Sequence, residues 1–364
     1  MCIRDRTSLI YQVADNGRLY QKYLGKKLNH DSDIQYLPQG TEAYLTHGME
    51  DYFEPAIHIR HNDNNSSLLL KYVDHSSNAI SNGVNETVIT LKDDKYPVTV
   101  TLHYVAYGKE NIIRAFSEIS HEEKKPVILC KYASSMLHLN SSKYFLTEFS
   151  GDWAHEANVT ERELAFGKKV IDTKLGARAN MFVSPFFQLA LDNPSQENAG
   201  EVLVGTIGWT GNFRFTFEVD NKNELRIISG INPYDSEYSL PAKEVFRTPD
   251  FYFTYSTQGK GEASRNFHDW ARNHQVKNGN DTRMTLLNNW ESTYFDFDEN
   301  KLIGLMDEAT KLGVDMFLLD DGWFANKYPR SSDHQGLGDW EETADKLPNG
   351  VGRLLEEAQK KGIK

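Results

Sequence analysis

The 364-residue sequence has very few cysteines and no long apolar stretch. Its two cysteines, Cys2 and Cys130, are too few for a disulfide framework or for a zinc site built from cysteine thiolates. No run of about 18 apolar residues occurs, so no membrane-spanning helix is predicted. Acidic residues outnumber basic residues by 52 to 40 without a visible basic patch, which argues against binding to DNA or RNA. We therefore expect neither nucleic acid nor a membrane as a partner.

The N-terminus also lacks the apolar segment of a signal peptide. On this basis we expect a cytoplasmic location, with the periplasm as the alternative, because the first residues, MCIRDR, fit no pattern in the rest of the sequence. The C-terminal stretch EEAQKKGIK stops where a helix has ended and a strand begins. We expect the chain to be a fragment of a longer protein whose native start is missing.

Aromatic residues are abundant, at 12% of the chain, which fits a large β-rich core and would also suit a sugar site. Between residues 7 and 258, stretches such as 98–108 and 212–220 alternate between apolar and polar residues and are separated by turn-forming clusters. The glycine-spaced stretch GTIGWTG has no βαβ unit around it, so we interpret it as a strand bend rather than a phosphate loop. Many short strands predict a large sandwich or barrel. In 212–220 the side chains expected on one face are Phe213, Phe215, Phe217 and Val219.

The pattern changes near residue 260, from period-2 alternation to helical periodicity. The predicted elements are a helix at 261–274, a polar linker at 275–283, a strand at 284–290, a helix at 298–313, a strand at 314–319 and a helix at 349–362. The helix limits rest on capping residues, Asp298 with Gly313 and Asn349 with Gly362. The predicted apolar face of 298–313 consists of Leu302, Ile303, Leu305, Met306, Ala309 and Leu312.

This β-α-β-α order predicts a parallel sheet. Both strands are nearly all apolar, as expected when a parallel strand is covered on both faces, and two strands alone cannot be covered in this way. We therefore predict a multidomain β plus α/β fold, in which a β sandwich precedes the first two βα units of a truncated (β/α)₈ TIM barrel. The expected limits are 7–258 for the sandwich, 259–282 for a helical linker and 283–364 for the incomplete barrel.

Two adjacent carboxylates, Asp320 and Asp321, follow the second of these strands in the stretch VDMFLLDDGWF. The carboxyl ends of barrel strands face the active site, so both side chains are candidate site residues. Two unpaired carboxylates cost desolvation and repel each other, and sugar hydroxyls would offset this cost by donating hydrogen bonds. The first strand ends in NNWE, which places Trp290 at the same edge with an aromatic face to offer. The two strand ends together predict one sugar-binding site.

Other interpretations of these residues stay open. The Asp-Asp-Gly sequence is also typical of a solvated turn, and Trp290 also fits a core position. A divalent cation on the two aspartates is a third alternative, although no histidine or third carboxylate is close in the sequence. We predict no metal and no cofactor.

The chain also contains a series of long motifs. These are EPAIHIRH, SGDWAHEANVTER and SGINPYDSEYSL in its first part, and NNWESTYFDF, LLDDGWF, LGDW and KLPNG in its second. In the same order, they resemble motifs of the α-galactosidases of glycoside hydrolase family 36, and the resemblance covers nearly the whole chain from residue 7. It implies a large N-terminal β-supersandwich, a catalytic (β/α)₈ barrel and a C-terminal β domain.

The resemblance also implies an activity, which is retaining hydrolysis of terminal α-D-galactose from oligosaccharides such as melibiose and raffinose. Asp320 and Asp321 match the family's pair that binds galactose hydroxyls, and Trp290 matches its substrate-contacting tryptophan. Asp51, in GMEDYFEP, resembles an N-domain aspartate that reaches a sugar, in some members across a subunit interface. We accordingly expect a full-length homo-oligomer, either a dimer or a tetramer.

Both catalytic carboxylates of the family come from later barrel strands. We therefore expect the nucleophile and the acid/base beyond Lys364, and no activity for the fragment alone. An α-N-acetylgalactosaminidase is the alternative within the same class of enzyme. A non-catalytic carbohydrate-binding sandwich is the alternative from another class, and the β-α-β-α tail argues against it.

Overall fold

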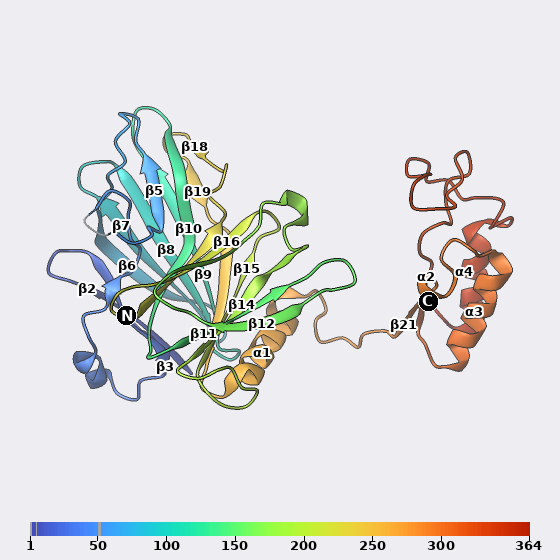
Figure 1. Ribbon diagram of the computed structural model, residues 1–364, viewed down its shortest axis with the longest axis horizontal. Coiled ribbons are helices and arrows are strands. Elements are labelled where there is room, and N and C mark those ends of the chain that lie inside the picture. The colour runs from blue at the N-terminus through green and yellow to red at the C-terminus, as the bar shows by residue number, and fades with distance from the viewer. Residues whose placement is uncertain (1, 5, 50–51) are drawn as a thin grey trace. The chain divides into compact units, whose positions relative to one another are not determined.

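The computed structural model describes residues 2–4, 6–49 and 52–364 of the chain, which divides into two compact units, Met1–Gly279 and Asn280–Lys364. Figure 1 shows strands throughout the first unit, and helices beside a short strand pair in the second. The predicted order, a β-rich part followed by βα units, is confirmed.

A small antiparallel sheet opens the first unit. Its strand order is β1-β2-β3-β4, with β1 Cys2–Arg4, β2 Thr7–Val13, β3 Leu19–Lys26 and β4 Thr41–Glu42. A short 3-10 helix, η1 Asp31–Tyr36, connects β3 to β4. Leu9, Leu19 and Leu24 of this sheet are buried in the main core of the unit, so the small sheet is part of the same folded body.

Two larger sheets make up most of the rest of the first unit. Among the described residues, one has the order β13-β16-β17-β10-β18 with β5 also paired to β10, and the other has the order β12-β11-β14-β15-β20-β9-β8-β7-β6 with β19 on β9. The bounds are β5 Ile57–Arg60, β6 Leu70–Ser81, β7 Val84–Asp93, β8 Val98–Tyr107, β9 Ile112–His121, β10 Val127–Asn140, β11 Tyr144–Ser150, β12 Asn158–Glu163, β13 Gly167–Asp172, η2 Gly176–Arg178, β14 Val183–Leu191, β15 Val202–Gly208, β16 Phe213–Val219, β17 Glu224–Ile231, β18 Tyr238–Leu240, β19 Val245–Arg247 and β20 Asp250–Ser256.

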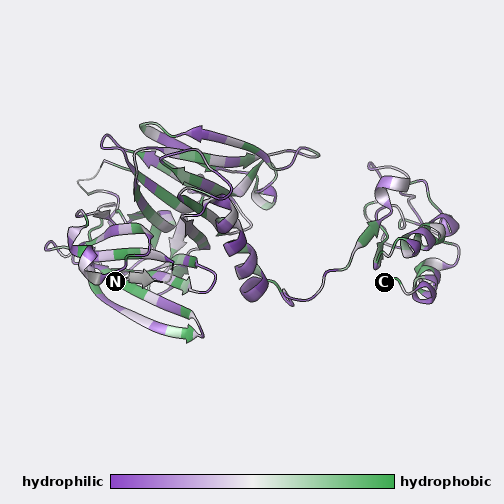
Figure 2. Ribbon diagram, turned by 90° about the horizontal axis from the view of Figure 1, so that it is seen from below, coloured by the Kyte–Doolittle hydropathy of each residue, from purple (hydrophilic) through white to green (hydrophobic). Residues whose placement is uncertain are grey.

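Aromatic side chains fill the space between the two larger sheets. Phe213, Phe215 and Phe217 of β16 are at most 1% exposed, which confirms the predicted inward face of this strand. The ring of Phe187, on β14 of the other sheet, lies 5.2 Å from the Phe215 ring and 4.9 Å from the Phe217 ring. Burying each of these side chains stabilises the fold by roughly 1.5–3 kcal/mol. Alternation of apolar and polar residues is visible as bands along the strands in Figure 2.

Gly205 explains the glycine-spaced stretch GTIGWTG. It lies within β15, and a Cβ at this position would be 2.7 Å from the Phe187 ring. Such a contact is too short for carbon atoms, so the aromatic packing requires glycine here. The first half of the stretch, up to Gly208, is thus strand as predicted, but β15 pairs without a bulge, and the chain bends only after the strand has ended, at Thr210 and Gly211.

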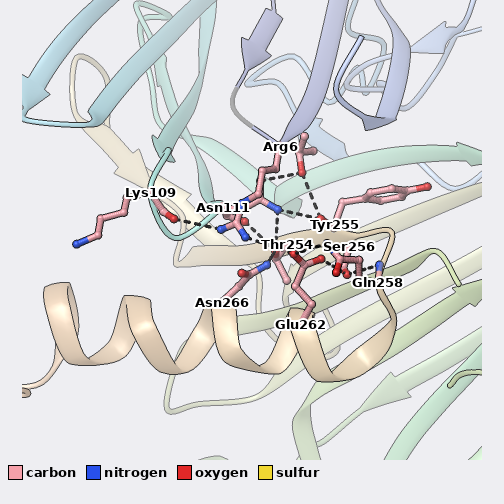
Figure 3. A network of polar contacts seen from close by, with 10 residues as sticks. Arg6, Lys109, Asn111, Thr254, Tyr255, Ser256, Gln258, Glu262 and Asn266 are labelled. Atoms are coloured by element: carbon pink, nitrogen blue, oxygen red, sulfur yellow. Dashed lines mark hydrogen bonds and ion pairs between the residues drawn. The ribbon is translucent and has the colours of Figure 1, made fainter. Parts of the chain in front are cut away.

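A buried polar network attaches the helix α1, Gly259–Trp270, to the sandwich (Figure 3). Asn266 of α1 donates a hydrogen bond to the Thr254 hydroxyl (3.0 Å), which in turn donates to the carbonyl oxygen of Asn111 (2.7 Å). Arg6 pairs with Glu262 at the start of the helix (3.4 Å). A short π-helical segment, η3 Ala271–Gln275, continues α1. The network links the start of β2, the β8–β9 turn, β20 and α1, since Arg6 also donates to the carbonyl oxygen of Lys109 (3.1 Å) and Thr7 to the side chain of Asn111 (2.9 Å).

The second unit contains a parallel strand pair, as predicted. Strand β21, Leu286–Asn288, pairs with β22, Met316–Leu318, and the helices are α2 Trp290–Thr293, α3 Glu299–Lys311 and α4 Gly350–Lys361. Leu302 and Met306 of α3 and Leu354 of α4 belong to one buried cluster. Asp298 caps α3, since its side chain accepts the N–H of Lys301 (2.8 Å), and Gly313 and Gly362 follow their helices with φ of 77° and 70°. Three of the four predicted caps are thus confirmed.

The remaining differences have local causes. Both strands are shorter than predicted, because each has one neighbour in the described part of the chain and Leu286 and Leu318 remain 49% and 44% exposed. Leu312 is 83% exposed, so its placement on the buried face of 298–313 was wrong; it follows the last residue of α3. Asn349 precedes α4, but its amide donates to Glu299 (3.0 Å) instead of capping the helix.

Candidate functional site

The carboxyl ends of β21 and β22 are joined by asparagine side chains. Asn288 ends β21, and its amide donates a hydrogen bond to the Asp320 carboxylate (2.6 Å). The next residue, Asn289, accepts the backbone N–H of Asp320 through its side-chain oxygen (2.8 Å). Parallel pairing of Asn288 with Leu318 brings these groups to the same edge. The two predicted strand ends therefore form one cluster.

Asp321 is held in a network of hydrogen bonds. Its backbone N–H donates to the Asp320 carboxylate (2.7 Å), and its own carboxylate accepts the N–H of Gly322 (2.6 Å). Both oxygens also accept hydrogen bonds from Arg330, one from Nε and one from Nη2. The hydrogen bonds from Arg330 lower the pKa of Asp321, and partial burial opposes this shift. Asp321 is therefore an ionised carboxylate of fixed orientation at neutral pH.

Arg330 is buried and fully engaged. Its Nη1 donates to the carbonyl oxygens of Ser332 (3.1 Å) and Gln335 (2.7 Å), so it also closes the loop that contains them. Its guanidinium carbon lies 5.5 Å from the centre of the Phe295 ring and 5.7 Å from that of Phe324. Arginine is suited to this place because its planar group forms paired hydrogen bonds and stacks on aromatic rings. The loop is thereby tied to Asp321.

Lys346, from the KLPNG motif, supports the same cluster through backbone carbonyl groups. Its ammonium donates to the carbonyl oxygens of Phe295 (2.8 Å) and Gly322 (3.0 Å) and lies 4.5 Å from the centre of the Phe297 ring. The pKa of Lys346 is lowered, because its burial outweighs the opposing effect of the negative charge of Asp321. Lys346 therefore positions the backbone of two segments that meet at the cluster.

Trp290 does not belong to the first strand as predicted. It begins the short helix α2, because its backbone N–H donates to the side-chain oxygen of Asn288 (2.8 Å) and the chain turns there. The half-buried indole packs edge-on against Tyr294 (5.3 Å) and Phe295 (4.9 Å). Phe295 is also the ring that Arg330 contacts, so Trp290 lies on the same cluster as Asp321. Trp290 is therefore part of the cluster at the strand ends rather than a fully buried core residue.

One premise of the sequence analysis was wrong. The two carboxylates are not unpaired, because Arg330 offsets the charge of Asp321 and the Asn288 amide bonds to Asp320. A simple solvated turn does not describe Asp321 either, since its partner is a buried arginine. A carboxylate has about four acceptor positions, so both groups keep capacity for further hydrogen bonds. Arg330 was missed because nothing in a single polar loop sequence distinguishes it from other arginines.

Some expectations are not located by the structure. Asp51, the fourth predicted site residue, lies outside the described residues. Within the part of the chain that is described, no three His, Cys, Asp or Glu side chains lie close enough to hold one metal ion. None of the helices formed by these residues is long and apolar enough to cross a membrane.

Comparison with known protein families gives two consecutive matches. The model of the Glycosyl hydrolase family 36 N-terminal domain matches residues 17–241, and the Melibiase model matches residues 245–364. Two bacterial relatives align with 98% of this chain: alpha-galactosidase Mel36A of Lactobacillus acidophilus at 28% identity, and alpha-galactosidase AgaA of Geobacillus stearothermophilus at 30%. The chain spans 53% of each, about half the length of these curated relatives.

Solved structures agree over the whole chain. A Geobacillus stearothermophilus AgaA variant in complex with 1-deoxygalactonojirimycin has a TM-score of 0.90 at 27% identity, and an AgaA variant in complex with raffinose has the same values. The α-galactosidase of Lactobacillus brevis has a TM-score of 0.88 at 26% identity. Each comparison covers 100% of this chain and 53–55% of the other. The fold is accordingly the sandwich and the beginning of the barrel, and the chain belongs to glycoside hydrolase family 36.

Proposed function

We propose that the protein is a retaining α-galactosidase that releases terminal non-reducing α-D-galactose from oligosaccharides such as melibiose and raffinose. The observation that carries this proposal is the cluster of Asp320, Asp321 and Trp290 at the carboxyl ends of β21 and β22, in a chain of this family. Solved relatives in complex with raffinose and stachyose support a galactoside oligosaccharide as the substrate class.

In this proposal the two carboxylates bind the sugar and Trp290 contacts it. Asp320 and Asp321 accept hydrogen bonds from hydroxyl groups, and charge-assisted bonds of this kind are stronger than neutral ones. The pair with Arg330 keeps Asp321 ionised and correctly oriented for this task. Asp51 remains a predicted fourth contact with the sugar.

We further propose that neither aspartate is the nucleophile or the acid/base. Retaining hydrolysis needs two carboxyl groups that flank the scissile bond at about 5–5.5 Å from each other. Asp320 and Asp321 are consecutive residues, and the backbone N–H of Asp321 bonds to the carboxylate of Asp320. Residues in this arrangement are poorly placed to act on opposite sides of a bond. The 364-residue chain alone should therefore show no turnover.

An assay of the protein expressed from its complete gene tests the activity. We expect hydrolysis of p-nitrophenyl α-galactoside and raffinose, little hydrolysis of the corresponding α-N-acetylgalactosaminide, and α-galactose as the first product seen by NMR. The 364-residue chain, assayed in parallel, should match a heat-inactivated control. Preference for the N-acetylated substrate would favour the alternative enzyme, and no hydrolysis of either would favour a binding protein.

Assembly and location are the remaining parts of the proposal. We propose a homo-oligomer, a dimer or tetramer, and exposed Trp153, Phe166 and Phe182 are aromatic groups that an interface would cover. Light scattering on the complete protein tests this, and a monomer would contradict it. We also propose a cytoplasmic location, with the periplasm as the alternative, to be tested by cell fractionation.

A further inference from the structure

Asn288, the last residue of β21, contacts two of the predicted site residues at once. Its amide nitrogen, Nδ2, donates a hydrogen bond to Oδ2 of Asp320 (2.6 Å), and its side-chain oxygen accepts the backbone N–H of Trp290 (2.8 Å). A backbone N–H can only donate and an ionised carboxylate can only accept, so chemistry fixes which end of the amide faces each partner. Asn288 therefore uses both of its polar atoms to hold residues of the candidate site.

The hydrogen bond to Asp320 fixes the direction of its carboxylate. Oδ2 accepts from Asn288 and Oδ1 accepts the backbone N–H of Asp321 (2.7 Å), so turning the carboxylate out of this direction would break both bonds. A carboxylate has about four acceptor positions, which leaves about two for sugar hydroxyls. Asp320 is half-buried, so a ligand can reach these positions from the solvent.

Both donors to Asp320 are uncharged. Arg330 pairs with Asp321, and Lys346 interacts electrostatically with the same carboxylate. Asp320, in contrast, forms no ion pair in the part of the chain that the structure describes. A neutral partner orients the carboxylate without offsetting its negative charge, and the charge stays available to strengthen hydrogen bonds from hydroxyl groups.

The hydrogen bond to Trp290 determines how the chain leaves the strand. A side-chain oxygen that accepts the N–H two residues further on forms an Asx turn, a common way for asparagine to turn the backbone. Trp290 is the first residue of α2, and its indole lies edge-on against Phe295, 4.9 Å away. Loss of this hydrogen bond would loosen the start of the short helix and with it the indole.

The neighbouring Asn289 already performs the structural task of joining the two strands. It is fully buried, its backbone N–H donates to Leu318 (3.3 Å), and its side chain bonds to the N–H of Asp320 (2.8 Å) and to Thr293 (2.9 Å). Asn288 is half-buried at the same edge, and its side chain bonds instead to the carboxylate of Asp320 and to the start of α2. This division of contacts favours a functional role for Asn288.

We propose that Asn288 is a positioning residue, which aims Asp320 and Trp290 at the same sugar ring. The identity of this sugar as galactose rests on the proposed function. An amide suits this place because one planar group offers a donor to the carboxylate and an acceptor to the N–H. An aspartate would keep the acceptor but set two carboxylates against each other, and an alanine would remove both hydrogen bonds.

Kinetics of the complete protein test this role, with kcat/KM for p-nitrophenyl α-galactoside measured from about pH 7.5 down to about pH 4.5, near the ordinary carboxyl range. Near pH 7, Asn288→Asp should lower kcat/KM about tenfold or more, since a hydrogen bond to a charged group is lost and a like charge is added. At lower pH the introduced carboxyl takes up a proton and can donate again. The ratio of variant to wild-type kcat/KM should therefore rise as the pH falls, while changes common to both proteins cancel.

Two further variants separate positioning from folding. Asn288→Ala, which cannot regain a donor, should lower kcat/KM by a similar factor at every pH. Asn349→Asp provides the control, because the Asn349 amide also donates to a carboxylate, that of Glu299 (3.0 Å), next to the start of α4. This control should reduce thermal stability, but its ratio of kcat/KM to the wild type should not change with pH.

The proposal is overturned if the ratio for Asn288→Asp stays within about twofold of one, or if it stays equally low at every pH. The first result would show no role, and the second a general structural defect. If Asn288→Asp does not fold, Asn288→Ala decides, and wild-type kcat/KM in that variant would contradict the role. Complete wild-type protein that hydrolyses no α-galactoside would overturn the proposed function and this inference together, whereas unchanged variants of an active enzyme overturn this inference alone.

Discussion

Among single residues, Arg330 does most to define the candidate site. It neutralises Asp321 through two parallel hydrogen bonds, and it fixes the adjoining loop through two carbonyl oxygens. The pKa of Asp321 is lowered in the folded state, chiefly by these hydrogen bonds. The stabilisation is therefore fully present above the ordinary carboxyl pKa of about 3.9, and it is lost as the pH falls below that value.

Replacement of Arg330 by methionine should loosen this loop. Asp321 and two carbonyl groups would lose their partner, which should destabilise the loop by about 1–3 kcal/mol. Hydrogen exchange in peptides covering 325–340 should accelerate correspondingly. Arg353→Met is the matched control, because Arg353 forms surface ion pairs, with Glu357 (2.9 Å) and Glu356 (3.7 Å), and such pairs contribute about 0–1 kcal/mol each. Equal exchange in the two variants would show that Arg330 does not hold the loop.

His138 makes the stability of the first unit dependent on pH. Burial lowers its pKa to about 3, the charge of Arg226 adds to this shift, and the hydrogen bond to the carbonyl oxygen of Glu42 opposes it. An unfolded histidine has a pKa of about 6.5, so the unfolded chain takes up a proton that the folded chain excludes. This contribution to stability is complete above about pH 6.5 and is lost as the pH falls towards 3.

The variant His138→Gln should remove this dependence. Between pH 6 and pH 4, the free energy of unfolding of the variant should fall less steeply than that of the wild type. The two slopes should differ by up to about 1.4 kcal/mol per pH unit, the value for one proton. Urea unfolding at several pH values measures the slope. The exposed His155 provides the control variant, His155→Gln, whose slope should equal that of the wild type. If His138→Gln keeps the slope of the wild type, His138 is not the source of this pH dependence.

Among the elements, aromatic packing between the sheets depends on Gly205. A methyl group at this position would lie 2.7 Å from Phe187 and 2.8 Å from Phe251. Gly205→Ala should therefore destabilise the first unit by about 1–3 kcal/mol, the usual cost of overpacking. Gly304→Ala, in α3 with open space around the new methyl group, should instead be neutral or stabilising by up to about 1 kcal/mol. Thermal unfolding of both variants measures this contrast, and an unchanged Gly205→Ala transition would contradict it.

Most elements could be predicted from local sequence signals. The alternation in β16 and the caps at Asp298, Gly313 and Gly362 are properties of a few neighbouring residues, so the sequence contains them. The ends of β21 and β22 depend on how many neighbouring strands are present, which no local pattern records. The same holds for Arg330, whose pairing with Asp321 spans nine residues of loop without a regular period.

For the whole chain, the division into two units predicts where proteases act first. The proposed limits are 7–258 for the sandwich, 259–282 for the helical linker and 283–364 for the barrel part, and these limits remain predictions. Residues 276–285 are mostly exposed and contain Lys277 and Arg283, without helix or strand. Limited trypsin digestion should cut there first, or further towards the C-terminus. The sites can be identified by mass spectrometry, and earlier cleavage within 98–220 would contradict the proposed limits.

Substitution of Asp321 tests the proposed sugar contact most directly. In the complete protein, Asp321→Asn keeps the side-chain size but removes the charge. Loss of one charge-assisted hydrogen bond to galactose should cost roughly 1.5–3 kcal/mol, which is about a 10- to 150-fold reduction in kcat/KM. Arg330→Met, which breaks the same ion pair but keeps the carboxylate, should retain more activity, and added azide should not rescue Asp321→Asn. The measurement is kcat/KM for p-nitrophenyl α-galactoside together with the inhibition constant of galactose. A value of kcat/KM within about twofold of the wild type, with an unchanged inhibition constant, would contradict a role of Asp321 in binding the sugar.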